Sequence, residues 1–342
     1  MSFVTVEQIK LKLKIFSELK QLIESECQSG GGTLPKHQWW RYWYYEFPYL
    51  IGSRSERIAR RFCEVFKNVT ELDSTGKITP YLGFAKDDSL TQKFTHLLEE
   101  LNARGAITNN LIAEARKPIL KYFENGDPIA VKLFKEFKPP SSPFLVKYSK
   151  KEFLEPMLAK GVIRICPASF YADDKHIDSV RDNETHRYFF IPTFRERLQG
   201  NASIEVQNHN IHFGDDDIEV PMVVPDYFMY SLCDHIYYRL PTDFDADAAL
   251  IIKDPILFTQ RVVSTFLSVQ AGWHPLVGNV TYYDPYMDYT KVSVPEMAKH
   301  FGYSYQREYR IAFQRKSHIK TNLVPQFIKI GPMTDYAELI AL

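Results

Sequence analysis

Apolar residues in the first part of the chain recur at steps of three and four positions, which is the spacing of one face of an α-helix. In the first such segment, residues 4–26, Val6, Ile9, Leu13 and Phe16 follow this spacing, and glycines at 30–32 end it. The pattern predicts further helices over residues 55–68, 89–104, 108–124 and 128–137, with glycines and an Asn-Gly pair as breaks. Residues 1–138 are therefore predicted to be mostly helical.

The helical pattern stops at the sequence KPPSSP, residues 138–143. Proline fixes φ and lacks a backbone N–H, so this stretch favours neither a helix nor a sheet. We predict a linker over residues 139–143. It divides a helical accessory or targeting domain, residues 1–138, from a second domain, residues 144–342.

Short runs rich in β-branched and aromatic residues follow the linker and predict strands. These strands cover residues 144–148, 162–166, 186–191, 226–233, 248–253, 279–283, 307–313 and 326–330, and predicted helices cover 150–160 and 255–270. Helices and strands do not alternate regularly, and the sequence contains neither G-x-G-x-x-G nor G-x-x-x-x-G-K-[ST]. The predicted fold class is α+β, and a Rossmann fold is not expected.

The amino-acid composition argues against several classes of protein. The chain has 42 Lys and Arg and 42 Asp and Glu residues, so no overall field draws it to nucleic acid or a membrane. Its four cysteines form no C-x-x-C pair, which argues against a disulfide framework and favours a reducing compartment. The first 16 residues, MSFVTVEQIKLKLKIF, are typical of neither a signal peptide nor a membrane span. We expect a cytoplasmic protein without a membrane partner.

The segment YQREYR, residues 305–310, carries the main candidate chemistry. In a strand, alternation places Gln306, Glu308 and Arg310 on one face. Cleavage of the nicotinamide–ribose bond of NAD⁺ builds positive charge on the ribose, which a carboxylate such as Glu308 can stabilise while Gln306 orients an acceptor. The alternative is an edge strand whose polar side chains face water.

Three segments in order support this interpretation: Lys147-Tyr148, the stretch KGVIRICPASFYAD over residues 160–173, and YQREYR. Together they resemble the ADP-ribosyltransferases, whose catalytic Glu often follows a Gln or Glu by two residues, and an uncharacterised bacterial domain family often suggested to share that fold. The resemblance covers residues 144–342. It implies a split antiparallel β-sheet core and mono-ADP-ribosyl transfer from NAD⁺, as co-substrate, to an intracellular protein or nucleic acid. Bacterial toxins and phage-defence effectors are the expected setting.

The resemblance also implies the contacts with NAD⁺. An early-strand Arg or His binds the diphosphate or adenosine ribose in these transferases, and a Tyr or Ser-Thr-Ser element frames the nicotinamide. This chain has no clean version of either. The candidate cofactor-binding residues are Lys147 and Tyr148 at the early strand, Ser169, Tyr171 and Ser231 near the nicotinamide, and Arg181 and Arg310. For Arg181, a solvated helix start capped by Asp182 or Asn183 is an alternative.

Other functions stay open at this point. Hydrolysis of NAD⁺ needs Glu308 but not Gln306, because water then replaces the acceptor. A binding module with a degenerate site is the other alternative. A regulatory partner or antitoxin at the helical domain is also expected.

Two further clusters have competing interpretations. His209 and His212, followed by three aspartates, can ligate a cation, but their place between two strand-like runs favours a hairpin, so no metal site is predicted. Residues 37–45, HQWWRYWYY, mix rings and a guanidinium as single-strand binding surfaces do. However, Trp39, Trp43 and Phe47 fall at helical spacing, as in a core stripe.

Overall fold

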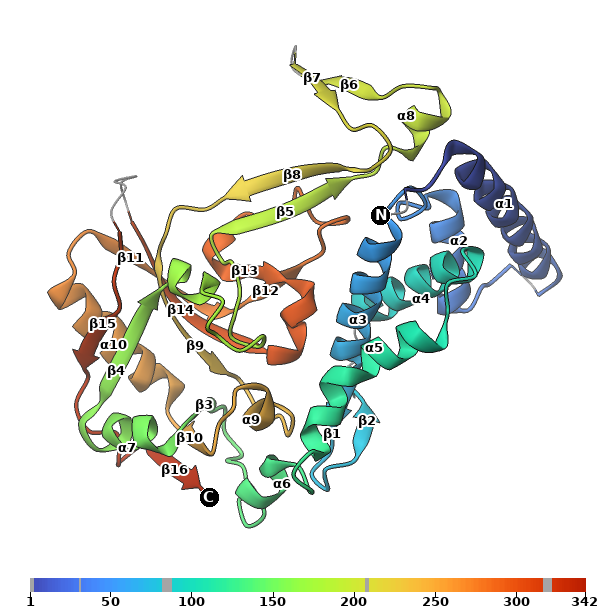
Figure 1. Cartoon of the computed structure of the whole chain (residues 1–342). Helices are drawn as coiled ribbons and strands as arrows, with labels where there is room; N and C mark the ends of the chain where they lie inside the picture. The colour runs from blue at the N-terminus through green and yellow to red at the C-terminus, as the bar shows by residue number, and fades with distance from the viewer. Residues whose placement is uncertain (1–2, 31, 82–87, 207–208, 316–321) are drawn as a thin grey trace.

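The computed structural model describes residues 3–30, 32–81, 88–206, 209–315 and 322–342. The N-terminal helices stand at one side of the molecule and the main sheet at the other (Figure 1). The helices are α1 (Val6–Ser29), α2 (Lys36–Glu46), α3 (Ser55–Val69), α4 (Asp88–Ala103), α5 (Asn109–Leu120), the 3-10 turn η1 (Lys121–Phe123) and α6 (Ile129–Leu133). A short hairpin, β1 (Thr70–Leu72) and β2 (Ile78–Pro80), lies between α3 and α4. The helices predicted for this region are confirmed, although α6 is shorter than residues 128–137.

The C-terminal part is built on an antiparallel sheet that forks. Its strands run in the order β11 (Trp273–Asn279), β14 (Glu308–Arg315), β9 (Phe228–Cys233), β3 (Leu145–Ser149), β10 (Ala248–Ile252) and β16 (Ala337–Ala341). β14 pairs along one edge of β9. The other edge meets β3 at Cys233 but β4 (Val162–Pro167) at Phe228 and Met229, and β4 then pairs with β15 (Gln326–Lys329). The sheet therefore divides between β3 and β4.

Helices and short elements cover this sheet. They are α7 (Lys151–Lys160), η2 (Ala168–Ala172), α9 (Leu240–Asp243), α10 (Pro255–Val269), β12 (Thr281–Tyr283), η3 (Pro295–Met297), β13 (Ala298–His300) and η4 (Phe301–Gln306). The main core lies between the sheet and α10, where Phe266 stacks on Phe313 with ring centroids 3.9 Å apart. The α+β class predicted from the sequence is confirmed.

A two-stranded arm of β5 (His186–Ile191) and β8 (Ile218–Val223) leads away from the sheet to α8 (Phe194–Leu198) and the hairpin of β6 (Ser203–Val206) and β7 (His209–His212) (Figure 1). His209 and His212 belong to this hairpin, as predicted. The nearby Asp216 and Asp217 instead form ion pairs with Arg57 of α3.

The predicted linker, residues 139–143, forms neither helix nor strand and is mostly exposed. Apolar side chains from the two sides of it nevertheless pack together. Phe62 of α3 belongs to one hydrophobic cluster with Tyr286 and Phe301, and Phe134 belongs to another with Tyr148. The domain boundary stays a prediction, but an apolar core joins the helical region to the sheet region.

The aromatic residues in and after α2 are buried and exposed in the opposite sense to the predicted core stripe. Trp39, Trp43 and Phe47 are exposed, whereas Tyr44 and Tyr45 are buried against α1. The tyrosines tolerate this position because their hydroxyls bond to carboxylates of α4, for example Tyr44 to Glu100 at 2.5 Å. The core-stripe interpretation is therefore wrong.

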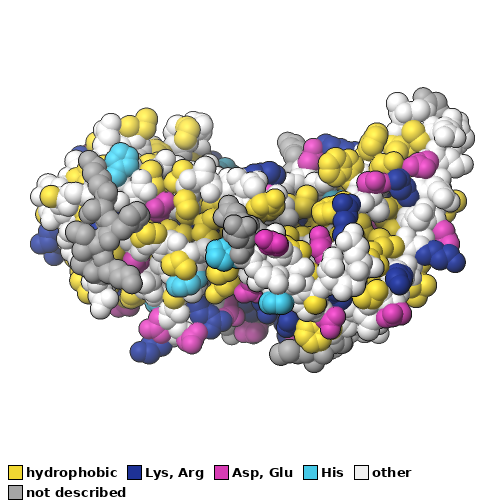
Figure 2. Space-filling model, turned by 90° about the horizontal axis from the view of Figure 1, so that it is seen from above, with side chains coloured by type: hydrophobic (Ala, Val, Ile, Leu, Met, Phe, Trp, Pro, Cys, Tyr) yellow, Lys and Arg dark blue, Asp and Glu magenta, His cyan; other side chains and the backbone are white. Residues whose placement is uncertain are grey.

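The surface mixes charges of both signs. On the face seen from above, Lys and Arg side chains are interspersed with Asp and Glu, and neither sign covers the face alone (Figure 2). Among the helices of the described ranges, none has the length and apolar character needed to cross a bilayer.

Candidate functional site

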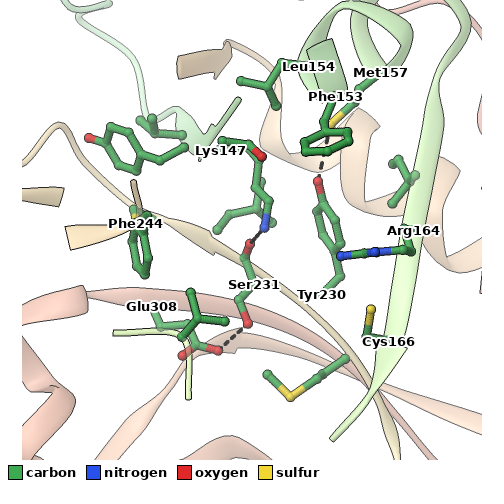
Figure 3. Close-up of a pocket in the computed structure, with 18 of the residues that line it drawn as sticks. Lys147, Phe153, Leu154, Met157, Arg164, Cys166, Tyr230, Ser231, Phe244 and Glu308 are labelled. Carbon is green, nitrogen blue, oxygen red and sulfur yellow. Dashed lines mark hydrogen bonds between the residues drawn. The ribbon is translucent and has the colours of Figure 1, made fainter. Parts of the chain in front are cut away.

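A cavity of about 450 Å³ opens where β3 and β4 diverge from β9 (Figure 3). This volume is in the range of small-molecule sites, about 300–1,000 Å³. Polar groups on its wall come from Lys147, Glu152, Arg164, Ser179, Glu184, Ser231, Lys299, Gln306 and Glu308, and apolar groups from Phe153, Met157, Val162, Met229, Phe244 and Phe327. The fork thus places three carboxylates, several cations and apolar side chains around one space.

Glu308 is the first residue of β14 and is held by three donors. Ser231 Oγ and Arg310 Nε each donate to its Oε1 at 2.6 Å, and Lys299 Nζ lies 3.2 Å from its Oε2. Burial alone raises the pKa of Glu308, but Arg310 and Lys299 outweigh it and hold the pKa well below its usual range. The side chain is therefore a fixed carboxylate on the cavity wall.

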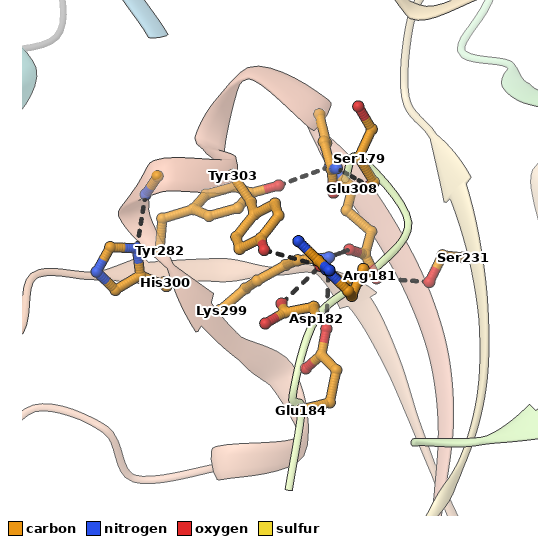
Figure 4. A network of polar contacts seen from close by, with 12 residues as sticks. Ser179, Arg181, Asp182, Glu184, Ser231, Tyr282, Lys299, His300, Tyr303 and Glu308 are labelled. Carbon is orange, nitrogen blue, oxygen red and sulfur yellow. Dashed lines mark hydrogen bonds and ion pairs between the residues drawn. The ribbon is translucent and has the colours of Figure 1, made fainter. Parts of the chain in front are cut away.

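A second layer of buried charge supports this carboxylate (Figure 4). Arg310 is fully buried and binds Glu184 through both Nη atoms, at 2.7 and 3.1 Å. Lys299 lies 3.4 Å from Glu184 and 3.7 Å from Asp182. Burial, together with repulsion from Glu184, raises the pKa of Asp182 to about 7. The network satisfies charges that would be costly to bury singly.

Glu308 and Arg310 share one strand face, as predicted, whereas Gln306 does not lie on the strand. It ends η4, and Arg307 then adopts the left-handed conformation, with φ 48°. This conformation is uncommon for a residue with a side chain and turns the backbone into β14. Gln306 still lines the cavity, and its Nε2 donates to the Ser179 carbonyl at 2.6 Å.

The N-terminal region holds η4 in place. Asn68 of α3 accepts hydrogen bonds from Ser304 Oγ and the Tyr305 backbone N–H, each at 2.6 Å, and donates to the Phe301 carbonyl at 3.1 Å. These bonds are buried. A helix outside the predicted catalytic domain therefore positions the segment that leads into Glu308.

Lys147 and Tyr148, the early-strand candidates, have different environments. Lys147 Nζ donates to the Ser231 carbonyl at 2.8 Å and lies 4.6 Å from the centre of the Tyr230 ring. Burial lowers its pKa. Tyr148 also reaches the cavity wall, but its ring packs with Phe134 and its hydroxyl accepts a hydrogen bond from the Tyr237 N–H. Lys147 is thus the better placed of the two for a ligand.

Of the other residues predicted to contact NAD⁺, some line the cavity and some lie outside its lining. Tyr171 and Ser231 line the cavity, and Arg310 lies behind Glu308. Ser169 is bound to Asp226 outside the cavity lining, and Arg181 is exposed and paired with Asp178. Residues 181–183 form no helix, so the helix-start alternative for Arg181 is wrong.

Arg164 and Lys299 line the cavity but were not singled out in the sequence. Arg164 reaches from β4 toward Tyr230 (Figure 3) and makes no ion pair within the described part of the chain. The sequence could have identified Arg164, because the alternation in VIRIC places it on the strand face opposite to the buried Ile163 and Ile165. Lys299 lies on β13, a strand of three residues that has no clear pattern in the sequence.

No protein-family model, curated protein or solved structure matches this chain.

Proposed function

We propose that the chain is an NAD⁺-dependent mono-ADP-ribosyltransferase that modifies an intracellular macromolecule, with Glu308 as its catalytic carboxylate. The main support is the position of Glu308, a charged and fixed carboxylate on the wall of a ligand-sized cavity. Such a group stabilises developing positive charge without having to reorganise during the reaction. A toxin or phage-defence effector is the setting that we propose.

In the proposed reaction, NAD⁺ supplies an activated ribosyl group whose bond to nicotinamide breaks, and nicotinamide leaves with the bonding electrons. Glu308 stabilises the ribose cation and accepts a hydrogen bond from a ribose hydroxyl. Ser231 keeps the carboxylate in orientation. Lys147, a cation without an ion pair among the described residues, faces the cavity and suits the diphosphate. The acceptor then bonds to the ribose and loses a proton.

Hydrolysis of NAD⁺ is a second candidate, favoured by the burial of Gln306. Only 3% of this residue is exposed, so it can contact only a group that enters the cavity. Water meets this condition more easily than the side chain of a large acceptor. We therefore assign Gln306 to the acceptor of the transfer reaction, and hydrolysis does not need it, because water then replaces the acceptor.

Mass spectrometry after incubation of the protein with NAD⁺ and a cell extract tests the proposal. Transfer predicts a macromolecule with one added ADP-ribosyl group and release of nicotinamide. Free ADP-ribose without a modified macromolecule would establish hydrolysis instead. Unchanged NAD⁺ would contradict both reactions and favour a binding module. The same extract can reveal a regulatory partner or antitoxin bound to the helical region.

A further inference from the structure

Two phenylalanines at the cavity wall are unusually exposed. Phe153, in the first turn of α7, is 63% exposed, and Phe327 of β15 is 70% exposed, although both line the cavity. Neither side chain belongs to the hydrophobic core beneath it. Large apolar side chains gathered at the mouth of a cavity are typical of a contact surface.

Cations alternate with these rings on the same face. Arg164 is directly opposite Phe327 in the antiparallel β4–β15 pair, so the two side chains share one face. Along β15, Phe327 and Lys329 are exposed, whereas Ile328 between them is buried in the core. We call the lining residues Phe153, Arg164 and Phe327, together with Lys329 beside them outside the lining, the rim.

The rim is basic in character. Arg164 and Lys329 form no ion pair with any residue that the structure describes. Glu152 is the acidic residue of α7 that also reaches the cavity wall, while Glu184 and Glu308 are paired with Arg310 deeper inside. Exposed rings, and cations with no ion pair among the described residues, therefore lie at the entrance and beside it.

We propose that the rim binds single-stranded nucleic acid, with bases stacked on Phe153 and Phe327 and phosphates at Arg164 and Lys329. Stacking on aromatic rings beside cations is the chemistry by which proteins hold unpaired strands. The bases of a duplex are stacked inside it and are not available to these rings. This inference deepens the proposed function and rests on it in one respect: it makes a nucleic acid the acceptor.

Binding can be measured without any reaction. The full chain, without NAD⁺, is titrated into a fluorescently labelled, unstructured oligonucleotide of about 12 nucleotides, within the range of single-strand site sizes. We expect Phe153→Ala and Phe327→Ala each to weaken the affinity about tenfold, from the loss of one stacked base. Tyr289→Ala is the matched control, because Tyr289 is 57% exposed but lies outside the cavity lining, and it should bind as the wild type does.

Two further measurements define the chemistry. Arg164→Ala should reduce the slope of log affinity against log salt by about 0.7, the value for one phosphate contact on a single strand. A duplex of the same sequence should bind at least about tenfold more weakly, because it offers no free base to stack.

The proposal is overturned if the rim variants bind as the wild type does, if duplex binds as tightly as single strand, or if an acidic peptide competes equally well. It is also overturned if only Trp39→Ala and Trp43→Ala weaken binding, because α2 would then be the surface. Glu308→Gln separates this inference from the proposed reaction, because it should abolish NAD⁺ consumption and leave binding at the rim unchanged. Rim-dependent binding by a wild-type protein that consumes no NAD⁺ would support the surface and contradict the enzyme.

Discussion

The two ends of the cavity differ in how their charges are held. At the inner end, Glu308, Arg310, Lys299 and Glu184 are buried and paired with one another. At the rim, Arg164 is exposed beside an exposed ring and lies 5.3 Å from the centre of the Phe170 ring, with no ion pair to a residue in the described ranges. Buried, paired charges fix geometry and are costly to disturb, whereas exposed groups change binding with little effect on the fold. Mutations should therefore change stability at the inner end and ligand affinity at the rim.

The largest effect on stability is expected at the inner end. Arg310→Ala leaves Glu184 and Glu308 buried without their main partner, which should cost about 3–5 kcal/mol of the free energy of unfolding. Urea unfolding measures this cost. Arg181→Ala is the control: its pair with Asp178 is exposed and should contribute less than about 1 kcal/mol. Equal costs for the two variants would remove the contrast between buried and exposed pairs.

A smaller loss of stability is expected where the helical region supports the inner end of the cavity. Asn68→Ala removes three buried hydrogen bonds to η4, at about 1 kcal/mol each, and should lower the free energy of unfolding by about 3 kcal/mol. Asn110→Ala, at an exposed position of α5, serves as the control. If both variants unfold at the same urea concentration, the helical region does not hold η4.

The stability of the folded protein should depend on pH because of Asp182. Its pKa is about 7 in the folded protein and about 4 in the unfolded chain, so the folded state binds more protons between these values. This group therefore makes the protein less stable as the pH rises from about 4 to about 7, and the contribution is constant above that. Asp182→Asn should remove this part of the slope. Parallel stability curves for the variant and the wild type over this window would contradict the assignment.

The smallest effect on stability is expected at the rim. Phe153→Ala and Phe327→Ala remove exposed side chains and should change the free energy of unfolding by less than about 0.5 kcal/mol. The same urea titration checks this. A loss above about 2 kcal/mol would mean that these rings belong to the core, and the contrast between the two ends would fail.

Local sequence pattern predicted the strands but not how they meet. The alternation in VIRIC and in REYRIAF predicted β4 and β14 and the shared face of Glu308 and Arg310. The fork could not be predicted, because the pairing of β9 with both β3 and β4 depends on contacts distant in sequence. The cavity depends on the fork and could therefore not be predicted from a local pattern either.

The errors have physical causes of the same kind. Period-two alternation does not extend to Gln306, two residues before β14, because Arg307 makes a left-handed turn that leaves no signal in residue type. The exposed face of α2 was mistaken for its core face, because tyrosines with carboxylate partners can be buried in place of tryptophans. Contacts distant in sequence accompany both differences: Asn68 of α3 holds η4 before the turn, and carboxylates of α4 accept hydrogen bonds from the buried tyrosines.

The catalytic role of Glu308 can be tested by comparing two carboxylates of the inner network. Glu308 and Glu184 both bind Arg310 and lie near Lys299, so Glu308→Gln and Glu184→Gln should lose similar stability. Consumption of NAD⁺ is measured per folded molecule for both. We predict that Glu308→Gln lowers the rate about a hundredfold or more, as expected for a lost transition-state contact, and that Glu184→Gln lowers it less than about tenfold. Equal rates per folded molecule would show that Glu308 only stabilises the fold and would contradict its catalytic role.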